Sequence, residues 1–170
     1  VGTQAPTKKI EVNGDILATS IYLGGSASAN QLDDYEEGSW TPDQRFGSGN
    51  SGVTYVNREG SYTKIGRMVT VNWNIELSSK GSSSGEARIY GLPFTPANLL
   101  SNTSVESNGV SSYWNNFDPD IYVMVFSANS SGYINIRSQD ADGLHDALQD
   151  MTNSTFRNDS TYRGSITYFV

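Results

Sequence analysis

The stretch RMVTVNWNIELS, residues 67–78, constrains the fold more than any other part of this chain. Its apolar and polar residues alternate strictly, so every second side chain falls on the same face of an extended strand. The apolar face carries Val69, Val71, Trp73, Ile75 and Leu77. This pattern predicts an antiparallel strand with one face on a core and the other toward solvent. Its place on the apolar face favours packing over ligand binding for Trp73.

Further segments at strand spacing predict an all-β protein. They are SYTKIG (61–66), ARIYGLPF (87–94), DIYVMVFS (120–127), YINIRS (133–138) and YRGSITYFV (162–170). The side chains expected to point inward are Ala87, Ile89, Ile134 and Ile136, whereas DIYVMVFS is apolar on both faces, as in the middle of a sandwich or at a subunit interface. Only DGLHDALQDM (142–151) has helical spacing, enough for one or two turns. About eight short strands separated by turns predict a β-sandwich, jelly-roll-like head.

The chain divides into three expected parts. Residues 1–30 are extended, with too few apolar residues to bury a core alone, and this predicts the end of an intertwined fibre shaft whose partner strands come from other chains. Residues 31–42 form an acidic neck or linker, and residues 43–170 form the head domain. The polar sequence DQRFGSGN (43–50) leaves the first strand of the head undefined.

Composition excludes several functions. The net charge of -7, without a basic stripe, disfavours nucleic acid and anionic membranes as partners. The absence of cysteine excludes disulfides, thiolate metal sites and thiol nucleophiles. No apolar run approaches the roughly 20 residues of a membrane-spanning helix, so membrane insertion is not expected.

The acidic stretch NQLDDYEEGSWTP (30–42) could be a metal site, a catalytic carboxylate cluster or a linker. Its acidic residues, Asp33, Asp34, Glu36 and Glu37, have no histidine nearby and no spacing that aims several oxygens at one point. A solvated or interchain-paired linker is the favoured interpretation.

The combination LDDYEEGSWTP, then GSYTKIGRMVTVNWNIEL, then IYGLPFTP resembles the C-terminal head domain of bacteriophage tail fibres and related tail appendages. The preceding APTKKIEVNGDI resembles the last turn of a phage fibre shaft, where three chains wind together. The resemblance covers Ala5 to about Pro96 and, more loosely, the closing GSITYFV. Residues 99–120 have no counterpart in it, as expected if that region carries host specificity.

This resemblance implies a homotrimeric, non-enzymatic adhesin head at the exposed tip of a tail fibre on the virion. Its implied partners are the rest of the fibre or virion and bacterial surface polysaccharide or lipopolysaccharide, and no cofactor is implied. Trp40 would close the base of the head. The acidic neck, present three times, would need cationic partners, for which Lys64 and Arg67 are candidates.

The segment SSYWNNFDPD (111–120) has the composition of a sugar-binding loop, because aromatic faces stack on sugar rings while amides and carboxylates bond hydroxyls. The candidate ligand-binding residues are Tyr113, Trp114, Asn115, Asn116, Phe117, Asp118 and Asp120. The alternative is that Trp114 and Phe117 turn inward and pin the loop. Tyr90 and Tyr133 are expected on outer faces, where they could line a glycan groove.

Other chemistries find little support. Ser138, Asp140, Asp142 and Gly143 match part of a calcium loop, but Gln149 replaces the bidentate glutamate, so no metal site is expected. The single histidine, His145, cannot make a histidine-based zinc site, and no G-x-S-x-G elbow is present. No catalytic residues are therefore assigned. The alternatives to an adhesin are a structural trimerisation cap or decorating fibre without a ligand and, less favoured, a glycan hydrolase using carboxylates such as Asp118 and Asp120.

Overall fold

The computed structural model describes residues 12–32, 34–98, 105–117, 121–140 and 148–170, and the chain forms two units, residues 1–34 and 35–170. In the first unit, β1 (Ile21–Tyr22) pairs with β2 (Gln31–Leu32), joined through the short 3-10 helix η1 (Ser28–Asn30). The large apolar side chains among residues 12–23 are exposed: Val12, Ile16, Leu17, Ile21, Tyr22 and Leu23. The described part of this unit has no buried apolar core.

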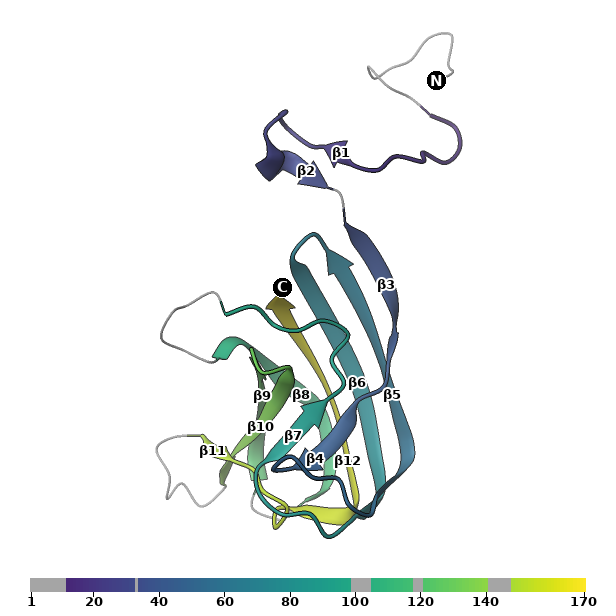
Figure 1. Cartoon of the computed structure of the whole chain (residues 1–170). Coiled ribbons are helices and arrows are strands. Elements are labelled where there is room, and N and C mark those ends of the chain that lie inside the picture. The colour runs from purple at the N-terminus through teal and green to yellow at the C-terminus, as the bar shows by residue number, and fades with distance from the viewer. Residues whose placement is uncertain (1–11, 33, 99–104, 118–120, 141–147) are drawn as a thin grey trace. The chain divides into compact units, whose positions relative to one another are not determined.

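The second unit is one antiparallel sheet (Figure 1). Its strands are β3 (Tyr35–Trp40), β4 (Asp43–Phe46), β5 (Val53–Ile65), β6 (Met68–Lys80), β7 (Ala87–Tyr90), β8 (Val105–Phe117), β9 (Ile121–Asn129), β10 (Tyr133–Asp140), β11 (Gln149–Asp150) and β12 (Phe156–Phe169). The order is β3-β5-β6-β12-β8-β9-β10-β7-β4, with β11 beside β10. The sheet curls so that β4, at one end, contacts β5, next to the other end.

This architecture confirms the all-β prediction and leaves the predicted sandwich unconfirmed, because the described strands of this unit belong to a single curled sheet. Alternation shows which face of a strand is buried and does not show which strands pair. The C-terminal strand β12 lies between β6 and β8, which fixes the chain end inside the sheet.

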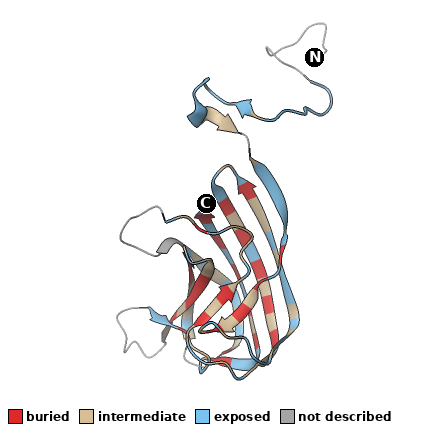
Figure 2. Cartoon of the chain, in the orientation of Figure 1, coloured by how far each residue is buried: buried red, intermediate tan, exposed pale blue. Residues whose placement is uncertain are grey.

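The core fills the inside of the curl (Figure 2). All five apolar residues predicted on the inner face of β6 are buried, as are the four inward residues predicted for β7 and β10. Aromatic rings meet edge to face across the curl: Trp73 lies 4.7 Å from Phe126, and Phe46 lies 5.2 Å from Phe156, between ring centroids. Trp40 is also buried, with its ring centroid 6.4 Å from that of Trp73.

One buried hydrogen bond joins β4 to β12 through the core. The Tyr162 hydroxyl donates to the side-chain oxygen of Gln44, and both residues are fully buried. The main-chain N–H of Gln44 donates to the Tyr55 hydroxyl at 2.9 Å. Burial, with a smaller contribution from Tyr55, raises the pKa of Tyr162 well above its usual value of 10.0.

The free energy of unfolding is expected to fall once the pH exceeds about 10, because tyrosine ionises near that value only after the chain unfolds. The stability contributed by Tyr162 is fully present below pH 10 and is lost as the pH rises toward its folded pKa. Urea unfolding midpoints at pH 9, 10 and 11 should decline, and Tyr162→Phe should reduce the decline. If the urea midpoint declined equally with pH in the wild type and in Tyr162→Phe, ionisation of Tyr162 would not be the cause of the decline.

Several sequence expectations differ from the structure. Tyr35–Trp40, predicted as the second half of the neck, pairs along its whole length with β5. The polar sequence DQRF, which left the first strand of the head undefined, is β4, because β7 supplies its partner groups. Gln149–Asp150, predicted within a helical turn, forms β11, whereas residues 141–147 lie outside the described part. The β10 residue Asn135, which alternates with the inward Ile134 and Ile136, is nevertheless only 8% exposed.

The two proposed cationic partners of the neck lie at the β5–β6 hairpin. Lys64 stands directly opposite Glu36 in the β3–β5 register, and its Nζ lies 5.2 Å from the centroid of the Phe94 ring. Arg67 donates from Nε to the main-chain oxygen of Val170 at 2.8 Å, which ties the hairpin to the end of the chain.

Candidate functional site

The outer surface of β5, β6, β12 and β8, called the polar face here, carries an organised set of polar side chains. Because these strands pair in register, residues from all four line up in rows across the sheet. The central row, called the polar row, consists of Glu59, Asn74, Arg163 and Tyr113. One flanking row consists of Asn57, Glu76, Thr161 and Asn115.

Interactions between side chains connect the polar row from end to end. Asn74 donates from Nδ2 to Glu59 Oε1 at 3.3 Å, and Arg163 donates from Nε to Asn74 Oδ1 at 3.1 Å. The Arg163 guanidinium carbon lies 5.1 Å from the centroid of the Tyr113 ring. Each side chain therefore holds the orientation of the next, so the row presents its polar groups in a fixed arrangement.

A shallow hollow of about 370 Å³ opens beside this row, lined by Glu59, Gly60, Ser61, Asn72, Trp73 and Asn74. Gly60 pairs with Trp73 at its centre, and the Trp73 side chain packs in the core, so the middle of the hollow is backbone. Its rim is one carboxylate, two amides and one hydroxyl. Such groups bind hydroxyl-rich ligands by offering both donors and acceptors.

The carboxylate at the rim is held in its charged form. Glu59 accepts hydrogen bonds from Asn57 Nδ2 at 3.0 Å and from Asn74, and these bonds, in that order, lower the pKa of Glu59 below its usual value. The carboxylate is thus an acceptor over a wider range of pH than an isolated glutamate.

The predicted site residues separate into two groups. Tyr113 and Asn115 lie on the polar face and are exposed. Trp114 points the other way, packs against the core and is half-buried, and Phe117 is buried with its ring centroid 4.8 Å from that of Phe156. Both aromatics thus follow the alternative interpretation, because the segment is the end of β8 and not a loop, and successive side chains of a strand alternate between faces.

Asn116 lies at an irregularity in the pairing of β8 with β12 and has an unusual conformation. Its φ of 61° is in the left-handed region that asparagine tolerates, and its side chain donates to Asp159 Oδ2 at 3.2 Å. The Ser160 hydroxyl donates to the Asn116 carbonyl at 2.6 Å, so Asn116 connects β8 to the irregular start of β12. Asp118 and Asp120 lie outside the described residues, as do Asp142, Gly143 and His145.

Most of the polar row and of the rim of the hollow was not predicted from the sequence. Glu59 and Arg163 are single charges without a local motif. Asn72 and Asn74 were predicted only to lie on the solvent side of an alternating strand. The available signal was the density of amides at those solvent positions in VTVNWNIEL. Only the pairing of strands far apart in sequence places Arg163 between Asn74 and Tyr113.

Neither a metal centre nor a membrane span emerges from the described part of the chain. Among those residues no group of three or more His, Cys, Asp or Glu side chains could hold a metal ion. None of the helices described there is long and apolar enough to cross a bilayer.

Comparison with known proteins gives a likeness of fold. No protein-family model and no curated protein matches the sequence. The crystal structure of Dettilon tailspike protein (gp208) resembles this chain with a TM-score of 0.60 and 19% sequence identity. The match covers 79% of this chain and 24% of the tailspike chain. The chain therefore shares its all-β fold with about a quarter of a tailspike protein.

Proposed function

We propose that the chain is the distal head of a phage tail fibre or tailspike, a non-catalytic adhesin that binds bacterial surface polysaccharide or lipopolysaccharide at the polar face. The polar row and the hollow beside it carry this proposal, since they form an ordered surface of amide, carboxylate, hydroxyl and aromatic groups. The likeness of fold to a tailspike protein supports it.

A ligand on this surface would use hydrogen bonds and one aromatic contact. Asn72 and Ser61 offer donors and acceptors from the rim of the hollow, Glu59 accepts from sugar hydroxyls, and Tyr113, 44% exposed, gives an edge or face for sugar C–H groups. Because the side chains are already tied to one another, little ordering is needed on binding. A shallow open site implies modest affinity for each copy.

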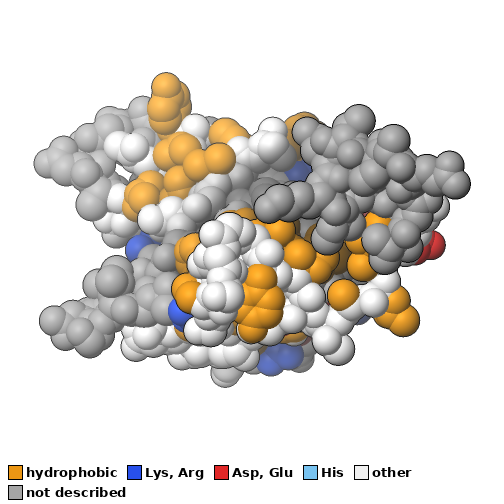
Figure 3. All heavy atoms as spheres, turned by 90° about the horizontal axis from the view of Figure 1, so that it is seen from above, with side chains coloured by type: hydrophobic (Ala, Val, Ile, Leu, Met, Phe, Trp, Pro, Cys, Tyr) orange, Lys and Arg blue, Asp and Glu red, His pale blue; other side chains and the backbone are white. Residues whose placement is uncertain are grey.

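Trimerisation would convert modest sites into firm attachment, because linked sites gain orders of magnitude in apparent affinity. Two exposed apolar surfaces support self-association. One is the set of apolar side chains in residues 12–32. The other is an apolar row across the β3–β5–β6–β12 register, formed by Tyr35, Ile65, Met68 and Phe169, whose side chains are 61%, 42%, 40% and 41% exposed. Exposed apolar side chains are visible among uncharged polar ones in Figure 3.

Sedimentation of the purified chain is expected to give the mass of three chains. Deletion of residues 1–30 should weaken the trimer, because it removes most of the exposed apolar residues of the first unit. A monomer at micromolar concentration would contradict the trimer proposal.

The apolar row also favours a second candidate function, a structural cap. If the head is such a cap, removal of residues 39–170 would abolish the trimer. An adhesin would instead keep some assembly and lose attachment.

The binding proposal is tested by presenting the labelled chain to a panel of purified bacterial capsular polysaccharides and lipopolysaccharides. Retention of at least one of them, without release of reducing sugar, is the expected result. Release of reducing sugar would show a glycan hydrolase. Failure to bind any polysaccharide or any bacterial cell would leave the structural cap as the better explanation.

A further inference from the structure

A second ordered surface lies on the outer side of β4, β7 and β10, at the opposite end of the strand order from β5 and β6. It consists of two arginines and two tyrosines, here called the Arg–Tyr cluster: Arg45, Arg88, Tyr90 and Tyr133. The guanidinium carbon of Arg45 lies 4.6 Å from the centroid of the Tyr90 ring, and that of Arg88 lies 4.5 Å from the centroid of the Tyr133 ring. The two rings lie 5.2 Å apart, so the tyrosines predicted as separate outward residues form one group.

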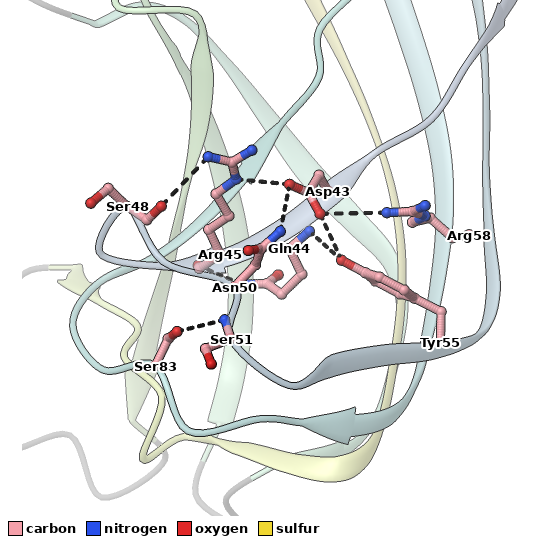
Figure 4. Close-up of polar contacts among 9 residues, drawn as sticks. All are labelled: Asp43, Gln44, Arg45, Ser48, Asn50, Ser51, Tyr55, Arg58 and Ser83. Carbon is pink, nitrogen blue, oxygen red and sulfur yellow. Dashed lines mark hydrogen bonds and ion pairs between the residues drawn. The ribbon is translucent and has the colours of Figure 1, made fainter.

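Both guanidinium groups are fixed by carboxylates two residues earlier on the chain. Arg45 donates from Nε to Asp43 Oδ2 at 2.7 Å and from a terminal nitrogen to the Ser48 carbonyl at 3.5 Å, as Figure 4 shows. Arg88 donates from a terminal nitrogen to Glu86 Oε2 at 2.5 Å. A guanidinium carries five N–H donors, so these bonds orient each arginine and use only part of its capacity.

The charge arrangement leaves a local excess of positive charge for a further anion. Arg45 and Arg88 stand directly opposite each other in the β4–β7 register, and like charges at that position destabilise a sheet. Asp43 is shared, because its other oxygen accepts from Arg58 at 3.4 Å and from Tyr55 at 3.1 Å. Three arginines thus meet two carboxylates, Asp43 and Glu86, which leaves a local charge of +1 on a chain whose net charge is -7.

We propose that the Arg–Tyr cluster binds the anionic group of an acidic sugar, a carboxylate or a phosphate ester, between Arg45 and Arg88. Guanidinium groups recognise both oxyanions with paired N–H donors, and an anion placed there would offset the like-charged pair. The neighbouring tyrosines provide hydroxyls and ring edges for the sugar. This inference rests on the proposed glycan-binding function and adds a preference for a polysaccharide that contains an acidic sugar.

The net charge of the chain favours an acidic sugar over a nucleic acid as the ligand. A nucleic acid also carries oxyanions, but a net charge of -7 would repel a long polyanion, whereas one acidic sugar within a mostly neutral polymer needs only a local positive site. Such binding should weaken as the salt concentration rises.

The test is a titration of the complete chain, followed by NMR, with glucuronic acid, glucose 6-phosphate and glucose at low ionic strength. At least one of the two acidic sugars should bind roughly tenfold more tightly than glucose, since charge-assisted hydrogen bonds outweigh neutral ones. Shifts should concentrate on the Tyr90 and Tyr133 rings, with the Tyr113 ring unaffected. Which acid binds identifies the carboxylate or the phosphate ester as the ligand group.

Arg45→Gln and Arg88→Gln are each expected to remove the preference for the acidic sugar. Arg137→Gln is the matched control, since Arg137 also donates from Nε to a carboxylate, Asp150, at 2.7 Å and has the same 35% side-chain exposure as Arg45. Equal affinity of the wild-type chain for all three sugars, or equal loss with Arg137→Gln, would overturn the inference. If a variant fails to fold, the residues whose NMR signals shift in the wild-type chain still show whether the acidic sugar binds at the Arg–Tyr cluster. Retention of neutral polysaccharide at the polar face tests the proposed function separately.

Discussion

The double variant Asn74→Ala, Arg163→Ala is expected to lose at least about a hundredfold in apparent affinity for the recognised polysaccharide. Each side-chain hydrogen bond contributes about 1 kcal/mol, so disruption of the polar row weakens one site by roughly tenfold. In a trimer that binds by several sites at once, losses at the individual sites multiply. The effect should therefore be much larger on adsorption to cells than on binding to a single short saccharide.

A control for this variant exists on the same face. Thr70 and Thr167 also stand opposite each other on β6 and β12 and share a hydrogen bond of 2.8 Å between their hydroxyls, but neither lines the hollow. Thr70→Ala, Thr167→Ala removes one cross-strand pair and should leave adsorption within about twofold of the wild type, as expected for near-neutral residues outside a binding site. Equal losses in the two double variants would place the binding site elsewhere.

The buried half of this fold was predictable because it depends on a local pattern. In the segment 67–78, alternation alone identified the inner residues of β6, and the same logic identified those of β7 and β10. Burial of alternate side chains is a property of one strand, independent of its neighbours. For the same reason the aromatic residues of β8 do not share one face: Tyr113 and Trp114 are consecutive, so a strand must send them to opposite faces.

The candidate sites were less predictable because each combines strands that are distant in sequence. In the polar row, Arg163 is 89 residues from the Asn74 that orients it. In the Arg–Tyr cluster, Tyr90 and Tyr133 are two separate aromatics in the sequence, predicted on outer faces, and only the pairing of β7 with β10 brings their rings together. The register that joins them follows from the order of strands in the sheet, and no local pattern encodes that order.

The second large effect is expected on the free energy of unfolding, from changes to the inner residues directly beneath the hollow. Trp73 has a glycine opposite it on each side, Gly60 on β5 and Gly164 on β12. A Cβ added at Gly164 would lie 2.4 Å from a carbon of the Trp73 indole and 2.6 Å from a carbon of the Phe126 ring. The glycines are therefore required by the width of the aromatic layer.

Trp73→Ala is expected to lower the free energy of unfolding by roughly 3–5 kcal/mol, as for other large-to-small changes in a core. Gly164→Ala should cost about 1–3 kcal/mol, because the added methyl group forces the packed rings apart. Chemical denaturation measures both. Outer-face changes such as Thr167→Ala provide the reference, since they should shift stability by roughly 0.5 kcal/mol or less.

A double-mutant cycle shows whether a side chain is excluded at Gly164 because of steric conflict with the indole of Trp73. If steric conflict with Trp73 is the reason for Gly164, then Gly164→Ala should cost much less in a Trp73→Leu background, and the two changes should be non-additive. Additive costs would mean that Gly164 is needed for its backbone or for Phe126 alone. Since Gly60 and Trp73 also form the centre of the hollow, a strongly coupled core would tie the shape of the proposed glycan surface to the packing directly beneath it.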